Sequence, residues 1–357
     1  MTKKTRVGIV GAGWVATNRH LPALAELEDA EVSQIWSRQS EKAQKVAGEF
    51  KIAKVVDGWE KIVKSEEIDA VVVATPPNLH HAVTIAALKA GKHVLCQGRM
   101  ARNLKEAKEM LAAARSAKLV TALYPPRPGL KGDRVMRRLI HDEKALGEIR
   151  EVRLTSLAFA EETDNYQWTE DPEIFGVNVM TLGLWGEVMN RWLGPVATVA
   201  AVAQTHRKQR KTVAGDWAAA AIPDSLAVSA KLQSGATATY HFSSRAFSGP
   251  GHLLEIFGSK GALSYKFFAE EIQGTSAGAT GMQAISVPES EERAQTTDSE
   301  FIRAIHEGTP VSPDFEEGAR YMALCDAVAF SALQGGSVPV DASKPRMQAW
   351  GQPLKTP

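Results

Sequence analysis

Cysteine is scarce in this chain of 357 residues, charge is nearly balanced, and long apolar runs are missing. The two cysteines, Cys96 and Cys325, cannot form a disulfide framework and are typical of a reducing compartment. A formal net charge of +1 offers no basic surface for nucleic acid. No apolar stretch approaches the ~20 residues of a membrane span, and no signal-peptide pattern precedes the first predicted strand. We expect a cytoplasmic protein that contacts neither nucleic acid nor membrane.

Length and apolar content predict two domains, since 357 residues exceed one ordinary core and 44% of them are hydrophobic. We place a first domain at residues 1–124, a second at 125–345 and a tail at 346–357. The first domain alternates between strands and helices, which predicts a doubly wound parallel sheet of the Rossmann type. Its strands are expected at 6–10, 30–37, 53–56, 70–74, 93–96 and 119–123, and its helices at 15–28, 40–50, 58–65, 79–90 and 104–117.

The pattern changes after the proline-rich residues 125–128, which are a natural domain junction. Most of the strands that follow have no helices between them, which predicts an α/β domain with a large open, mostly antiparallel sheet. These strands are expected at 148–159, 197–204, 226–232, 237–242, 253–258 and 263–267, with helical stretches at 132–141 and 173–192. Residues 270–297 are expected to form a loop with little structure, and helices at 300–306 and 315–333 close this domain.

A dinucleotide-binding fingerprint, Gly11-x-Gly13-x-x-Ala16, follows the first strand directly and opens a helix. The first glycine permits a tight turn, the second lets the backbone approach a pyrophosphate, and the small third residue lets the helix pack closely. The amides that begin this helix favour a bound phosphate. We assign the pyrophosphate to Gly11, Gly13, Trp14 and Val15, with an ordinary glycine-rich turn as the alternative.

The end of the second strand indicates which nicotinamide dinucleotide is preferred. NAD sites usually place a carboxylate there for the ribose 2′-hydroxyl. This strand ends instead in Ser37 and Arg38, which can bind a 2′-phosphate. We therefore expect NADP in preference to NAD, the alternative being that Arg38 is a solvated surface charge.

A polar turn follows the fourth strand, at the edge where open parallel sheets bind ligands. Thr75 and Asn78 are placed to touch the ribose or the nicotinamide, although Pro-Pro-Asn also forms turns without a ligand. The remaining cofactor assignments are the neighbours of these two residues and the end of the fifth strand: Ala74, Pro76, His80 and Gln97.

A series of motifs makes the chain resemble the Gfo/Idh/MocA family of oxidoreductases. They lie at residues 11–16, 74–80, 90–96, 104–107, 146–149, 191–194 and 256–261. The resemblance implies a Rossmann domain, a C-terminal α/β domain with an open sheet, NAD(P)-dependent chemistry on a sugar-like small molecule, and homodimers or tetramers formed through that sheet.

The chain departs from the family at three catalytic positions. The family lysine falls on Gly98, its aspartate on Thr181 and its histidine on Trp185. Hydride transfer from an alcohol needs a base for the hydroxyl proton, and none of these three residues supplies one. The resemblance therefore does not carry the usual proton relay onto this chain.

Other side chains are candidates to replace that relay. His80 titrates near neutral pH and is the first candidate acid or base, with a positional role as the alternative. Arg99 and Tyr124 can bind a developing oxyanion, although Arg99 can also be a solvent-facing charge. Asn178, Thr181 and Trp185 are spaced to share a helix face, where Trp185 either stacks on a ring of the substrate or packs in the core.

These observations favour an NAD(P)-dependent oxidoreductase with a non-standard proton relay. Two alternatives stay open: a redox-neutral lyase, isomerase or glycosidase on the same fold, and a dinucleotide-binding protein without catalysis. The histidines are scattered and none has the spacing of zinc ligands, so no metal is expected.

Overall fold

The computed structural model describes residues 4–124, 130–159, 165–212, 214–293 and 297–355. The chain divides into two compact units, the first comprising residues 1–128 with 296–319 and the second comprising residues 129–295 with 320–357. The sequence analysis did not anticipate that residues 296–319 belong to the first unit. The predicted junction at 125–128 lies outside the described residues.

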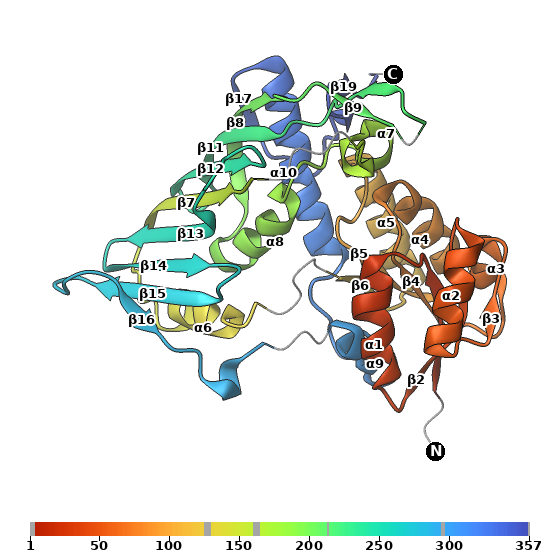
Figure 1. Cartoon of the computed structure of the whole chain (residues 1–357). Coiled ribbons are helices and arrows are strands. Elements are labelled where there is room, and N and C mark those ends of the chain that lie inside the picture. Colours follow the sequence, from red (N-terminus) through yellow and green to blue (C-terminus); the bar gives the residue numbers. More distant parts are fainter. Residues whose placement is uncertain (1–3, 125–129, 160–164, 213, 294–296, 356–357) are drawn as a thin grey trace. The chain divides into compact units, whose positions relative to one another are not determined.

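The first unit is built on a six-stranded sheet in the order β3-β2-β1-β4-β5-β6, with every pairing parallel (Figure 1). The strands are β1 (Thr5–Val10), β2 (Ala30–Trp36), β3 (Lys54–Val55), β4 (Ala70–Val73), β5 (His93–Gln97) and β6 (Thr121–Tyr124). The order reverses beside β1, which is the place where such sheets bind dinucleotides. The predicted Rossmann architecture is confirmed.

Helices cover both faces of this sheet because successive side chains of a strand point to opposite sides. Val7 and Ile9 are buried in one core, whereas a Cβ on Gly8 would lie 2.3 Å from Ile62 Cγ2 on the other side. The helices are η1 (Ala16–His20, a π-helix), α1 (Leu21–Ala25), α2 (Ser40–Phe50), α3 (Trp59–Lys64), η2 (Pro77–Leu79), α4 (His80–Lys89), α5 (Leu104–Ala117) and α9 (Thr297–Glu307).

Helix α9 lies in the first unit, whereas the sequence analysis placed it in the second domain. Its apolar side chains Phe301 and Ile302 are buried in the same core as Ile9. An amphipathic helix shows which of its faces is buried but not which sheet covers that face, so the sequence did not reveal this packing.

The second unit is built on a nine-stranded sheet in the order β16-β15-β14-β13-β7-β12-β11-β8-β17. All its pairings are antiparallel except that of β12 with β7, which confirms the mostly antiparallel prediction. Its strands are β7 (Ile149–Leu157), β8 (Val196–Gln204), β11 (Ser225–Leu232), β12 (Thr237–Ser243), β13 (Gly251–Gly258), β14 (Gly261–Lys266), β15 (Glu271–Ser276), β16 (Gln283–Ile285) and β17 (Ser337–Pro339).

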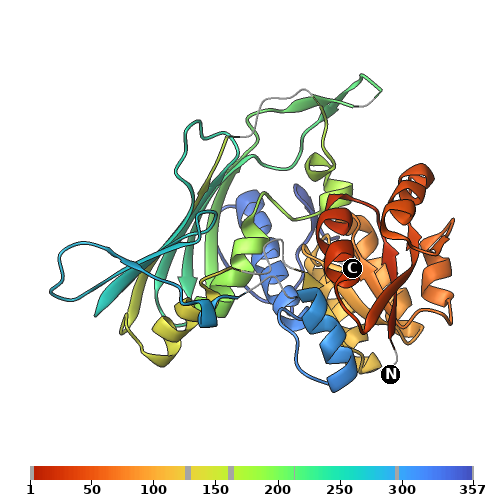
Figure 2. The ribbon, with the colours of Figure 1, turned by 60° about the horizontal axis from the view of Figure 1, so that its bottom comes forward.

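Helix α8 (Leu182–Leu193) lies along one face of this sheet, and α10 (Phe315–Gln334) ends in the same unit (Figure 2). We call the face under α8 the inner face. The other elements are α6 (Asp133–Arg137), η3 (Arg138–Asp142), η4 (Trp168–Glu170), α7 (Pro172–Phe175), η5 (Glu289–Glu291) and the small pairs β9 (Gln209–Lys211) with β10 (Trp217–Ala219) and β18 (Met347–Ala349) with β19 (Gln352–Pro353).

Two sequence predictions about this unit are wrong. Residues 270–297, expected to be a loop, contain β15 and β16, where Ile272 is buried and a Cβ on Gly274 would lie 2.7 Å from Ile285 Cδ1. The polar residues that suggested a loop are the outward half of an alternating pattern. The helix expected over 173–192 is interrupted, because Gly176 has a φ of +68° and α8 begins only after Thr181.

Aromatic packing and a buried ionic cluster fix α8 on the sheet. The Trp185 ring stacks on Phe267 with 4.0 Å between ring centroids. The Trp192 indole donates to the buried carboxylate of Asp133 at 2.7 Å, and Arg191 and Arg293 pair with the same carboxylate. Among the helices of the described part of the chain, none is both long and apolar enough to cross a membrane.

Candidate functional site

The fingerprint loop lies between β1 and η1 and has the backbone that its glycines require. Gly11 has a φ of +115°, and a Cβ there would lie 2.4 Å from the Ala74 carbonyl oxygen. A Cβ on Gly13 would meet only that same oxygen, at 3.9 Å, so Gly13 has an open side. Ala16 is fully buried, whereas Trp14 is 64% exposed. The loop therefore presents backbone rather than side chains on its open side, as a diphosphate site requires.

The end of β4 lies against this loop. The Ala74 amide donates to the Val10 carbonyl at 2.8 Å, and Thr75 Cγ2 lies 3.2 Å from the Cβ position of Gly11. Thr75 is only 9% exposed, and its buried hydroxyl has no hydrogen-bond partner within the described residues. Buried hydroxyls are rarely left unsatisfied. This orphaned group and the glycine cradle both fit a bound dinucleotide.

The remaining cofactor candidates lie at the same edge of the sheet. Gly11 donates its amide to the Trp36 carbonyl at 2.8 Å, which holds the end of β2 beside the loop. Ser37 and Arg38 follow, and the exposed Arg38 forms no ion pair with any residue that the structure describes. The other predicted cofactor-binding residues differ in exposure: Val15, Pro76 and Gln97 are half-buried, and Asn78 is exposed.

His80 is buried at the start of α4 and is not a solvent-facing acid or base. Its Nε2 lies 2.7 Å from the Thr75 carbonyl oxygen and its Nδ1 lies 2.9 Å from that of Arg99. Burial lowers the pKa of this imidazole more than the surrounding carbonyls raise it. The ring therefore connects the segment after β4 to the segment after β5, which agrees with the positional alternative.

Two further candidates are held by the backbone of the first unit. Tyr124 is buried at the end of β6, where its ring packs 4.2 Å from His20. Its carbonyl accepts the amide of Gly98 at 2.7 Å, which fixes the position where the resemblance expects a lysine. Arg99 is half-buried. The burial of Tyr124 weakens its assignment as an oxyanion donor.

Asn178, Thr181 and Trp185 were predicted to share one helix face, and in the structure they do not. Asn178 precedes the helix and is buried, with its side chain donating to the Phe175 carbonyl at 2.6 Å. Trp185 is 4% exposed and stacks on Phe267, which is the core-packing alternative. Thr181 stands at the N-terminus of α8 and pairs with Ser156 of β7 at 2.8 Å. Glu187, one turn before Arg191 on α8, pairs with that residue at 2.9 Å.

One residue at this end of α8 escaped the sequence analysis. His252 of β13 lies opposite Ser156 in the sheet register, and its Nδ1 is 2.7 Å from Ser156 Oγ. Alternation along 252–256 places His252 on the same side as Leu254 and Ile256, which are buried. That pattern was readable, but its pairing with β7 was not. Within the described residues, no group of three or more His, Cys, Asp or Glu side chains can hold a metal ion.

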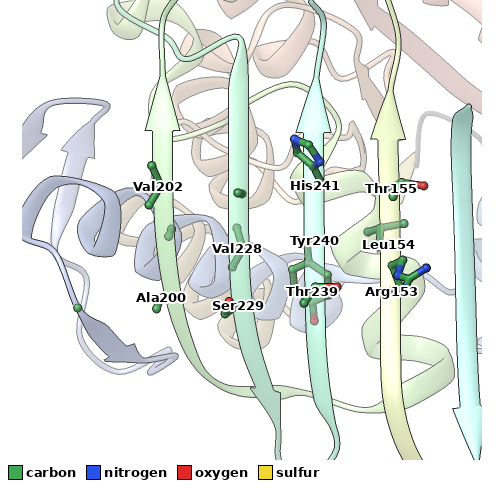
Figure 3. Close-up of a pocket in the computed structure, with 13 residues that line it drawn as sticks. Arg153, Leu154, Thr155, Ala200, Val202, Val228, Ser229, Thr239, Tyr240 and His241 are labelled. Atoms are coloured by element: carbon green, nitrogen blue, oxygen red, sulfur yellow. The ribbon is translucent and has the colours of Figure 1, made fainter. Parts of the chain in front are cut away.

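The outer face of the nine-stranded sheet carries Ala200, Val202, Ser229 and Thr239 together with the larger Arg153 and His241, over β8, β11, β12 and β7 (Figure 3). The register aligns Val202, Ala227, His241 and Thr155 in one row across these strands. Val202 is 73% exposed, and the face encloses a shallow hollow of about 550 Å³.

Comparison with known proteins identifies the family of both units. Residues 5–124 match the sequence model of an oxidoreductase family with an NAD-binding Rossmann fold, and residues 134–264 match the Gfo/Idh/MocA C-terminal domain. A scyllo-inositol 2-dehydrogenase (NADP(+)) from Bacillus subtilis is 26% identical over 185 residues, covering 50% of this chain and 55% of that protein. A 1,5-anhydro-D-fructose reductase from Ensifer adhaerens is 38% identical over 115 residues, covering 32% and 34%. The chain thus spans about half or less of these relatives.

Solved structures extend the likeness to nearly the whole chain. Levoglucosan dehydrogenase in complex with NADH and levoglucosan has a TM-score of 0.85 at 22% identity, covering 95% of this chain and 100% of that one. An oxidoreductase domain protein from Kribbella flavida has a TM-score of 0.85 at 21% identity, covering 96% and 100%. At such identities these structures show a shared fold. The two sequence models, which together cover most of the chain, show that this chain belongs to the Gfo/Idh/MocA family.

Proposed function

We propose that this chain is a cytoplasmic, NADP(H)-dependent oxidoreductase that acts on a sugar-like, hydroxylated small molecule. One observation carries the proposal: the cradle formed by Gly11 and the orphaned Thr75 hydroxyl at the carboxyl edge of the parallel sheet. The names of the relatives support the substrate class, because three of the four proteins compared above are dehydrogenases or reductases of inositol and sugar derivatives.

Different residues of the first unit would contact different parts of the cofactor. The amides from Gly13 to Val15 would face the diphosphate, and Thr75 would give its hydroxyl a partner on the ligand. When bound, the nicotinamide accepts or donates the hydride. His80 holds the segment that contains Gly98 and Arg99 in place through its contact with the Arg99 carbonyl. The proton relay cannot use the lysine, aspartate and histidine of the family, because this chain has Gly98, Thr181 and Trp185 there.

Preference for NADP over NAD rests on Arg38, because no carboxylate ends β2 and this guanidinium has no ion-pair partner among the described residues. A charge-assisted bond to a 2′-phosphate contributes about 1.5–3 kcal/mol. Arg38→Asp should therefore reduce the NADP/NAD affinity ratio by roughly 10–100-fold in calorimetric titrations.

Lys64→Asp is the matched control for Arg38→Asp. It makes the same change of charge on an exposed side chain at the C-terminal end of α3, which leads into the amino end of β4, away from the carboxyl ends of the strands. An affinity ratio that Arg38→Asp leaves unchanged, or that both variants lower equally, would show that Arg38 does not read the 2′ position.

The substrate class is tested with scyllo-inositol, levoglucosan and a set of aldoses, each with NADP⁺ and with NAD⁺. We expect steady formation of reduced cofactor, followed at 340 nm, with at least one of these polyols. The missing relay favours a second candidate, a redox-neutral enzyme, which would convert substrate without net change at 340 nm. Thermal stabilisation by the cofactor without any turnover would instead indicate a dinucleotide-binding protein.

We also propose that the outer face of the second sheet binds a second copy of this chain, forming a dimer or tetramer. The exposed Val202 and the small side chains beside it, Ala200, Ala227 and Ser229, suit close packing of two sheets, which stand about 10 Å apart when stacked. Analytical ultracentrifugation should show a dimer or tetramer that Val202→Asp dissociates. Leu333→Asp, which places the same charge on an exposed apolar position of α10, should leave the assembly intact. A monomeric wild-type protein would refute this proposal.

A further inference from the structure

Two exposed side chains, one aromatic and one cationic, follow the glycines of the fingerprint loop. Trp14 comes directly after Gly13 and is 64% exposed. Arg19 lies five residues later in η1 and is exposed as well. Its guanidinium carbon lies 5.5 Å from the centroid of the Trp14 ring, so the two side chains form a cation–π pair. Both residues belong to the first unit.

Hydrogen bonds within this segment fix the backbone that carries the indole. The Gly13 carbonyl accepts the amide of Thr17 at 3.1 Å, and the Trp14 carbonyl accepts Nδ2 of Asn18 at 2.9 Å. The Thr17 hydroxyl also donates to the Trp14 carbonyl, at 3.2 Å. Because these carbonyls point along the helix, the amides of Gly13 and Trp14 point the opposite way, to where a phosphate would bind. The indole is therefore attached at the phosphate-binding backbone itself.

The Arg19 side chain extends back toward the same amides. Side chains of a right-handed helix tilt toward its N-terminus, and the contact with the Trp14 ring places the guanidinium above the first turn. Arg19 forms no ion pair with any residue that the structure describes. A guanidinium and an indole N–H can donate hydrogen bonds but cannot accept them. The pair therefore suits an anion that offers acceptor oxygens.

A second observation indicates a ligand at this loop. The Thr75 hydroxyl, beside Gly11, is buried and has no partner within the described residues. We propose that Trp14 and Arg19 cover the diphosphate of the bound dinucleotide, with the guanidinium pairing with a phosphate oxygen and the indole shielding that contact from water. This inference rests on the proposed function, and it adds two side chains to a site that the sequence motif describes through backbone amides alone.

The proposal differs from the role of Arg38 in a measurable way. The diphosphate is common to NADP and NAD, whereas only NADP has a 2′-phosphate. Arg19 should therefore contribute equally to the affinity of both cofactors and leave their ratio unchanged. Exclusion of water by the indole strengthens the charge-assisted bond, since charges attract more strongly where the dielectric constant is low.

Isothermal titration of the full-length protein with NADP⁺ and with NAD⁺ tests the charge. Arg19→Gln should raise the Kd of both cofactors by about tenfold, since a charge-assisted bond to phosphate contributes on that scale. Lys89→Gln is the matched control, because it removes the same charge from an exposed side chain at the C-terminal end of α4, and it should change neither Kd. Unchanged Kd values in Arg19→Gln, or a loss confined to NADP⁺, would overturn the proposal.

Acrylamide quenching of tryptophan fluorescence tests the position of the indole without any substrate. Saturating NADP⁺ should shield Trp14, so the Stern–Volmer slope of the wild-type protein should fall. Trp14→Phe lacks this fluorophore and should show a clearly smaller fall. Because the side chain is exposed, this variant should melt at the wild-type temperature. An equal fall in the two proteins would show that the cofactor does not cover Trp14, which overturns the shielding role.

These measurements separate the inference from the proposed function. If the wild-type protein binds neither NADP⁺ nor NAD⁺, both proposals are refuted. If it binds them and both Arg19→Gln and Trp14→Phe behave as wild type, the inference about the Trp14–Arg19 pair is refuted while the proposed function stands.

Discussion

Replacing Gly11 by alanine should damage both the folding and the cofactor binding of the first unit. The new Cβ would lie 2.4 Å from the Ala74 carbonyl oxygen and 2.7 Å from its carbon, in a backbone conformation with a φ of +115°. Backbone strain of this kind costs 1–3 kcal/mol, and forced overlap costs a similar amount, so we expect a loss of about 3 kcal/mol in the free energy of unfolding. For a domain of this size that corresponds to a fall in Tm of about 6–12 °C.

Cofactor affinity should fall as well, because the shift that relieves the overlap displaces the loop and the Thr75 segment. A displacement near 1 Å at a binding site costs on the order of 100-fold. Differential scanning calorimetry measures the first effect, and isothermal titration with NADP⁺ measures the second.

Gly48→Ala is the matched control, because Gly48 lies in the interior of α2 and a Cβ there meets no atom within 4 Å. Alanine at this position should stabilise the protein by about 0.5–1 kcal/mol and leave NADP affinity unchanged. If Gly11→Ala melts at the wild-type temperature, the reasoning from backbone geometry is wrong.

Two further predictions concern buried ionisable side chains, those of His80 and Asp133. Because burial lowers the pKa of His80, the unfolded state binds this proton more readily, so the stability due to neutral His80 is present above its unfolded pKa of about 6.5 and is lost as pH falls through that value towards the lower folded pKa. His80→Asn should therefore reduce the slope of unfolding free energy between pH 7 and pH 5 by at most about 1.4 kcal/mol per pH unit, and an unchanged slope in urea titrations would contradict this assignment. Asp133→Ala should cost about 3 kcal/mol of unfolding free energy, because it removes the buried carboxylate that the half-buried Arg191 and Arg293 share. A loss below 1 kcal/mol in thermal denaturation would show that solvent replaces that carboxylate.

Most of the Rossmann unit could be predicted because its signals are local. The fingerprint at residues 11–16, a buried strand at 70–74 and the helix at 40–50 each follow from neighbouring residues, and the structure places elements at all three sites. The interrupted helix before Thr181 was missed, because residues 173–192 are largely apolar and the helix is broken by positive φ angles at Gly176 and Met180. Strand β15 was missed because its polar half dominates a short and glycine-containing segment.

The residues of the candidate site also differ in how much the sequence could show about them. Gly11, Thr75 and Arg38 were identified from the chain itself, since each follows directly from a strand end, and strand ends of a parallel sheet meet at one edge. The burial of His80 and Tyr124 could not be identified in this way, because it depends on which other parts of the fold pack over each residue.

The amino-acid sequence by itself determined the family and the fold of both units, because these reside in short motifs and in periodicity. Only the tertiary structure decided that α9 packs in the first unit and that His252 meets Ser156, Thr181 and Trp185. Contacts of this kind join residues far apart in the chain, 96 positions between Ser156 and His252 and 278 between His20 and Asp298 of α9. They depend on strand register and on how helices pack, which no local pattern encodes.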